Sequence, residues 1–147
     1  MPQTFAKIDR SLVILHVDDD PMNLRVVEEI LTAFNHRAVK ASSGAEALQQ
    51  IADQTFDVIL MDVHMPRMTG LEAVERIRAL PGPERDTPII ALTADVTSRR
   101  PEDYQALGFN GYVSKPILVS GLLDAIKAAT EPQTAPVVSP YRIDRAV

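Results

Sequence analysis

The stretch Val58-Ile59-Leu60-Met61-Asp62 contains four apolar residues in a row and then a carboxylate. An apolar run without polar alternation is typical of a strand covered on both faces, as the central strands of parallel sheets are. A second run of this kind, Pro88-Ile89-Ile90-Ala91-Leu92, follows further along the chain. These stretches predict central strands of a parallel sheet, and the first of them ends on an ionisable side chain.

Strands and helices alternate on both sides of these two stretches. Three more β-branched and aliphatic runs predict strands, at residues 12–17, 37–40 and 111–114. Apolar residues recur at helical spacing between the strands, and they predict helices around residues 24–34, 45–51, 71–77, 101–107 and 118–129. Because parallel neighbours need crossover connections, this alternation predicts an α/β fold: a doubly wound five-stranded parallel sheet with helices on both faces.

Composition excludes several classes of function. The chain has 147 residues, of which 46% are hydrophobic and 24% charged, and it contains no cysteine. Thiol nucleophiles, disulfides and thiolate zinc sites are therefore absent, and no apolar run approaches the roughly 20 residues of a membrane span. The net charge of −5 argues against a general nucleic-acid-binding surface. With no secretory signal visible, we expect a cytoplasmic protein without membrane association.

The pattern divides the chain into three parts. Residues 1–10 form a lead-in, residues 11–129 carry the alternating pattern, and residues 130–147 form a Pro-rich tail with Pro132, Pro136 and Pro140. The tail has no helical period, so we expect it to be extended or flexible.

Polar side chains fall where the predicted strands end. Asp18, Asp19 and Asp20 follow the first strand, and the third, fourth and fifth strands end at Asp62, Thr93 and Lys115. The carboxyl ends of strands in a doubly wound sheet share one edge, where ligands bind, so these residues should converge. Carboxylates that lie close together repel one another unless a cation lies between them, and oxygen ligands suit Mg²⁺. A carboxylate beside Mg²⁺ and a lysine is a plausible acceptor of a phosphoryl group.

Four motifs in this order closely resemble the receiver domains of bacterial two-component response regulators, in particular chemotaxis response regulators. They are HVDDDP at residues 16–21, VILMDVHMPRMTG at 58–70, IIALTA at 89–94 and GYVSKP at 111–116. The resemblance covers residues 11–129 and implies the flavodoxin-like strand order 2-1-3-4-5. The chain would then be a single-domain receiver with no DNA-binding domain.

The resemblance implies a role for each matching residue. Asp62 matches the phosphoacceptor, and Lys115 matches the lysine that pairs with the phosphoryl group. Asp18 and Asp19 match the acidic pair that holds Mg²⁺ together with Asp62, and the backbone carbonyl of His64 would be a further ligand. Thr93 and Tyr112 match the pair that switches on phosphorylation. The family also implies a cis peptide bond before Pro116.

Simpler structural roles compete for some of these residues. Asp20 precedes Pro21 at a predicted helix start, so we interpret it as a helix cap and not as a ligand. Tyr112 could be simple core filling. His16, His36 and His64 could suggest a phosphohistidine relay, but none lies in a recognisable donor helix, and structural roles are favoured.

The functional hypothesis is that a sensor histidine kinase or a histidine phosphotransfer protein phosphorylates Asp62, and that the changed surface binds a downstream protein. Catalysis would be limited to the chain's own phosphorylation and dephosphorylation. One alternative is an effector that binds an anionic nucleotide such as cyclic di-GMP through Arg99, Arg100, Arg142 and Arg145. In this alternative a helix starting at Pro101 leaves the first two arginines in a loop.

A second alternative is a small phosphohydrolase with an aspartyl-phosphate intermediate. Asp18 and Asp20 flank one residue, as in the D-x-D-x-T signature of haloacid dehalogenases, but Pro21 and Met22 depart from that signature. Turnover of a generic phosphate ester would distinguish this enzyme from a receiver.

Overall fold

The computed structural model describes residues 10–95, 97 and 99–131 of the chain. Its strands are β1 (Val13–Val17), β2 (Arg37–Ala41), β3 (Val58–Asp62), β4 (Ile89–Thr93) and β5 (Gly111–Ser114). Its helices are α1 (Pro21–Ala33), α2 (Gly44–Asp53), α3 (Gly70–Arg78), α4 (Pro101–Leu107) and α5 (Val119–Thr130). A short 3-10 helix, Pro83–Asp86, lies in the connection before β4. The lead-in and tail fall outside the described residues, apart from Arg10, Thr130 and Glu131.

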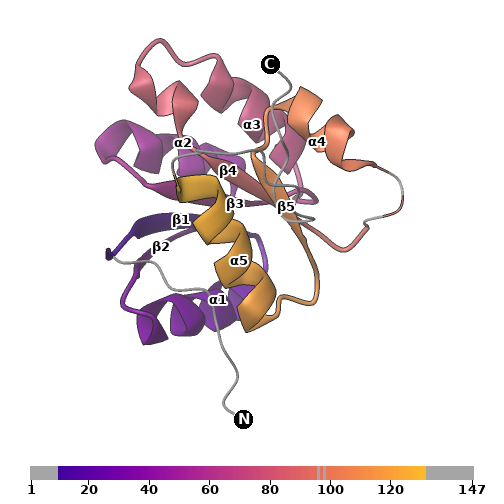
Figure 1. Ribbon diagram of the computed structural model, residues 1–147. Coiled ribbons are helices and arrows are strands. Elements are labelled where there is room, and N and C mark those ends of the chain that lie inside the picture. The colour runs from indigo at the N-terminus through magenta and orange to yellow at the C-terminus, as the bar shows by residue number, and fades with distance from the viewer. Residues whose placement is uncertain (1–9, 96, 98, 132–147) are drawn as a thin grey trace.

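The five strands form one parallel sheet in the order β2-β1-β3-β4-β5, which confirms the predicted doubly wound fold (Figure 1). Helices α1 and α5 cover one face of the sheet, and α2, α3 and α4 cover the other. All residues of β3 and β4 are buried, because helices cover these central strands on both sides. None of the helices in the described ranges combines the length and the hydrophobicity of a membrane-spanning segment.

Capping side chains set where the helices begin. Asp20 accepts a hydrogen bond from the Met22 amide at the start of α1, which confirms its predicted capping role. Thr69 and Glu72 form a reciprocal capping box at the start of α3. These caps satisfy backbone amides at the starts of α1 and α3, near the edge of the sheet at which the polar residues gather.

Arg78, at the end of α3, joins segments that are distant in sequence. Its guanidinium donates to the backbone oxygens of Arg85, Thr87 and Gly108 at 2.6–2.9 Å and to Asn110 Oδ1 at 2.8 Å. One side chain therefore ties α3 to the segments that precede β4 and β5.

Arg78→Met should lower the free energy of unfolding by about 2–4 kcal/mol, because several acceptors lose a charged donor at once. Urea unfolding measures this loss. The neighbouring Arg76 is exposed on the same helix, so Arg76→Met should change stability by less than about 0.5 kcal/mol. Equal effects of the two substitutions would contradict the role of Arg78 in joining α3 to the segments before β4 and β5.

Candidate functional site

Three carboxylates meet at the carboxyl edge of the sheet. Asp18 and Asp19 follow β1 and Asp62 ends β3, and one oxygen of each lies within 4.8 Å of the others. Asp18 and Asp62 are buried, whereas Asp19 is exposed. The carboxylates open into a cavity of about 280 Å³, lined by Asp18, Asp19, Asp20, Asn23, Asp62, His64, Ala94 and Lys115. The sequence predicted this convergence, and the donor set of hard oxygens fits Mg²⁺.

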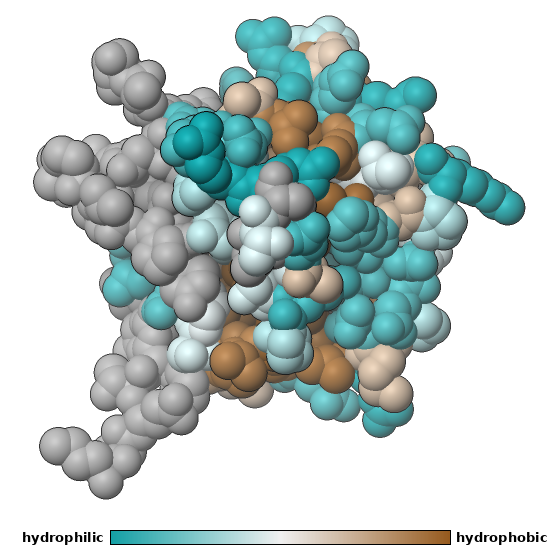
Figure 2. Space-filling model, turned by 90° about the vertical axis from the view of Figure 1, so that its right-hand side faces the viewer, coloured by the Kyte–Doolittle hydropathy of each residue, from teal (hydrophilic) through white to brown (hydrophobic). Residues whose placement is uncertain are grey.

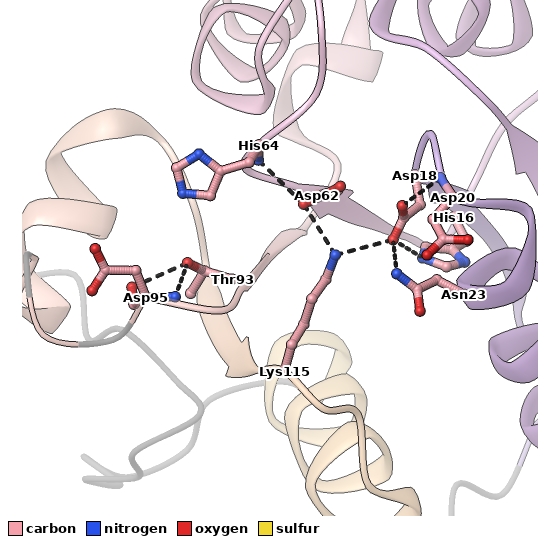
Figure 3. A network of polar contacts seen from close by, with 9 residues as sticks. All are labelled: His16, Asp18, Asp20, Asn23, Asp62, His64, Thr93, Asp95 and Lys115. Carbon is pink, nitrogen blue, oxygen red and sulfur yellow. Dashed lines mark hydrogen bonds and ion pairs between the residues drawn. The ribbon is translucent and has the colours of Figure 1, made fainter.

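Lys115, directly after β5, lies between two of the carboxylates. Its Nζ is 3.3 Å from Asp18 Oδ2 and 3.2 Å from Asp62 Oδ1 (Figure 3). Burial lowers the pKa of Lys115, but the negative charges of Asp18 and Asp62 outweigh burial and raise the pKa overall. The ammonium is therefore a fixed positive charge beside Asp62. The Lys115–Pro116 peptide bond is cis, as the resemblance implies.

The surroundings of Asp62 disfavour the ionised form of its carboxyl group. Burial, followed by the charge of Asp18, raises its pKa to about 6, although Lys115 and a hydrogen bond from the His64 amide act in the opposite direction. That amide lies 3.2 Å from Asp62 Oδ1. A cation among the carboxylates would relieve the repulsion that raises this pKa.

Asp18 is held by local hydrogen bonds on both oxygens. Its Oδ1 accepts from the Asp20 amide at 2.9 Å, and its Oδ2 accepts from Asn23 Nδ2 at 3.2 Å. Sequence reasoning missed Asn23. Its place in the first turn of a helix that starts three residues after Asp18 was the available signal.

The Thr93 hydroxyl is engaged away from Asp62. Thr93 is buried, and its Oγ1 donates to the Asp95 carbonyl at 3.0 Å and lies 3.1 Å from the Asp95 amide (Figure 3). The same carbonyl accepts from Tyr104 Oη at 3.4 Å. Thr93 is thus at the predicted strand end, with its hydroxyl turned to the segment that leads to α4.

Tyr112 packs on a second tyrosine that sequence analysis did not single out. The rings of Tyr104, on α4, and Tyr112, on β5, stack with centroids 5.4 Å apart and an interplanar angle of 19°. Tyr104 is buried, whereas Tyr112 is partly exposed. A continuous chain of contacts therefore runs from Thr93 through the Asp95 carbonyl and Tyr104 to Tyr112.

The arginines of the nucleotide-binding alternative are not seen as a cluster. Arg100 is exposed and occupies the N-cap position of α4, where its amide donates to Asp103 Oδ2 at 2.8 Å. Helix α4 begins at Pro101, as predicted. Arg99 is only partly exposed, and Arg142 and Arg145 lie outside the described residues.

The three histidines have different surroundings. His36 is buried, and its Nδ1 accepts a hydrogen bond from the Leu12 amide at 3.0 Å, which is a structural role. His64 is exposed beside the site. His16 is buried beneath Asp18.

Comparisons with known proteins agree with this geometry. Residues 14–127 match the family model of the response regulator receiver domain. The signal transduction histidine-protein kinase BarA of Escherichia coli K12 is 35% identical over 107 residues, which are 73% of this chain and 12% of that kinase. The chain thus spans only a small part of this curated relative, and the same holds for RpfC of Xanthomonas campestris, of which it covers 16%.

Solved structures show the same architecture. The chemotaxis response regulator CheY4 of Vibrio cholerae is 30% identical, with a TM-score of 0.75 over 82% of this chain and 99% of that one. The receiver domain of a sensor histidine kinase from Pseudomonas aeruginosa PAO1, solved with a magnesium ion coordinated in the active site cleft, is 32% identical, with a TM-score of 0.74 over 82% and 98%. With the family model matching most of the chain, we conclude that this protein belongs to the response regulator receiver domain family of two-component phosphorelay systems.

Proposed function

We propose that this chain is a response regulator that accepts a phosphoryl group on Asp62 from a phosphohistidine of a sensor kinase or a phosphotransfer protein. The observation that carries the proposal is the placement of Lys115 Nζ 3.2 Å from Asp62 Oδ1, beside a cluster of three carboxylates. In this proposal residues 11–129 form the receiver and residues 130–147 a tail. The test is a gain of phosphoryl mass from phosphoramidate, with and without Mg²⁺.

The residues at the site have complementary tasks in this transfer. An Asp62 oxygen forms a bond to phosphorus as the phosphorus–nitrogen bond of the donor breaks. Lys115 is already beside that oxygen and neutralises charge on the phosphoryl group. Asp18, Asp19, Asp62 and the backbone carbonyl of His64 would hold Mg²⁺, which supplies further positive charge when bound.

Exposed apolar side chains suit a protein donor. Met22 and Val26 are 64% and 40% exposed, one turn apart on α1, and Leu118 is 66% exposed at the start of α5. These helices lie on the same face of the sheet, and Met22 and Leu118 are at the helix ends nearest the carboxyl edge. In this proposal a protein donor contacts these side chains as it approaches the site.

The affinity for Mg²⁺ should depend on pH. Because the pKa of Asp62 is raised to about 6, the carboxyl is protonated below that pH and Mg²⁺ must displace the proton. Titration calorimetry should show affinity falling about tenfold between pH 7.5 and pH 5, with proton release near pH 6. Asp62→Asn should bind more weakly and lose this part of the pH dependence. Equal wild-type affinity at both pH values would argue against Asp62 as a ligand.

We further propose that Thr93 and Tyr112 transmit the structural change caused by phosphorylation of Asp62 to the surface formed by α4 and β5. That surface is mainly hydrophilic with separate hydrophobic areas (Figure 2), and Leu107 on α4 is 37% exposed. The downstream target would be a protein that binds there. For Thr93 to reach a phosphoryl oxygen, its hydroxyl must leave the Asp95 carbonyl, which Tyr104 also contacts.

Beryllofluoride with Mg²⁺, a mimic of the phosphoryl group, should shift the backbone amide resonances of β4, α4 and β5. Thr93→Ala should reduce these shifts to less than about half, because the hydroxyl that couples the site to the Asp95 carbonyl is gone. Thr97→Ala is the matched control, since its hydroxyl contacts the Asp95 side chain instead. Shifts of equal size in wild type and Thr93→Ala would point to another route.

A further inference from the structure

His16 is a buried polar residue directly below the acidic pair. It lies on β1, two residues before Asp18, so both side chains point to the same face of the sheet. His16 is 1% exposed and Asp18 is completely buried. On the same face and strand, the preceding residue is Ile14, an ordinary member of the core.

The imidazole has no hydrogen bond within the part of the chain that the structure describes. Neither His16 Nδ1 nor Nε2 has a partner there, although both atoms are buried. An unsatisfied buried polar group destabilises a fold, and an aliphatic side chain would avoid that loss. Asp18 Oδ2 lies 3.8 Å from Nε2, which is beyond hydrogen-bond distance.

The oxygen that His16 faces has two donors, and one of them has a second task. Asp18 Oδ2 accepts from Asn23 Nδ2 at 3.2 Å and from Lys115 Nζ at 3.3 Å. Lys115 also contacts Asp62 and, in the proposed function, pairs with the phosphoryl group. When the Lys115 ammonium moves to the phosphoryl group, the buried Asp18 Oδ2 loses one of its two hydrogen-bond donors.

We propose that His16 is a positioning residue for the magnesium site: its Nε2–H supports Asp18 Oδ2 from below and keeps the carboxylate oriented when Lys115 engages the phosphoryl group. An N–H donor below the carboxylate would orient Asp18 as a metal ligand. This inference rests on the proposed function of the site.

The test compares Mg²⁺ affinity with stability in the full chain. His16→Leu should bind Mg²⁺ about tenfold more weakly, as expected for loss of a group that orients a metal ligand. The same substitution should leave the urea midpoint unchanged or raise it, because unsatisfied nitrogens leave the core. His16→Gln, which keeps an N–H donor, should recover most of the affinity. His16→Met provides a second apolar variant if His16→Leu does not fold.

Ile14→Leu is the matched control for packing on the same strand and face, and its Mg²⁺ affinity should equal that of the wild type. Wild-type affinity in both His16→Leu and His16→Met would overturn the positioning role. So would equal loss of affinity in His16→Gln and His16→Leu. If the wild type binds no Mg²⁺, or binds it equally well in Asp19→Asn and Asp62→Asn, the proposed site itself is wrong, which is a distinguishable result.

Discussion

Asp62→Asn should abolish phosphorylation by phosphoramidate, a loss of at least about 10³-fold as expected for removal of a nucleophile. The amide keeps the size and shape of the carboxyl group but has no oxygen able to form the acyl phosphate. The loss is measured as the missing gain of phosphoryl mass in the intact protein after incubation with phosphoramidate and Mg²⁺.

The same substitution should not destabilise the protein. The raised pKa of Asp62 means that its ionised form is disfavoured in the fold, by burial and by Asp18. The neutral amide removes that unfavourable charge, so the urea midpoint at pH 7.5 should equal or exceed that of the wild type. Asp20→Asn is a matched control beside the site: asparagine caps a helix as well as aspartate does, and phosphorylation should persist. Loss of phosphorylation in both variants would contradict the distinct roles of Asp62 and Asp20.

Gly70→Ala should damage both the fold and the site. A Cβ at Gly70 would lie 2.1 Å from the backbone oxygen of Asp62 and 2.8 Å from the Cα of Val63. Both are main-chain atoms, so α3 or the end of β3 must shift. We expect a loss of about 3 kcal/mol or more in the free energy of unfolding. Displacement of Asp62 should also slow phosphorylation about 100-fold.

Gly82→Ala is the matched control for Gly70→Ala. It also replaces a glycine by alanine, but it does not crowd main-chain atoms. Its Cβ would also come within 2.1 Å of an atom, but that atom is the end of the flexible Glu84 side chain. Stability and phosphorylation should therefore stay near the wild type. Comparable losses at Gly70 and Gly82 would show that close approach to Asp62 is not the cause.

The location of the site could be predicted because it depends on topology. Once the apolar runs are assigned to parallel strands, residues at their carboxyl ends must share one edge, and Asp18, Asp62 and Lys115 do converge there. The strand ends and the direction of the chain are sufficient to place these residues at one edge. This placement does not depend on side-chain rotamers.

The side chains that complete the site could not be predicted in the same way. Asn23 reaches Asp18 from the first turn of α1, and the positions of the strand ends carry no information on how that turn is placed. The direction of the Thr93 hydroxyl depends on a local turn at Asp95. The stacking of Tyr104 on Tyr112 depends on how α4 packs against β5.

The contacts of Arg78, away from the site, could not be predicted from the sequence either. Its position near the end of α3 is typical of a solvated basic residue, yet acceptors from four other residues surround it. Those acceptors belong to connecting segments whose paths are decided by tertiary packing. Sequence periodicity describes helices and strands and does not describe such paths.

The central claim is that the phosphoryl group resides on Asp62, and locating the group on the wild-type chain tests it most directly. The chain is incubated with phosphoramidate and Mg²⁺, reduced with borohydride to trap any acyl phosphate as an alcohol, digested, and sequenced by mass spectrometry. We expect a reduced side chain at position 62 and at no other aspartate. Trapping at Asp18 or Asp19 instead, or a phosphoryl group found on His64, would contradict it.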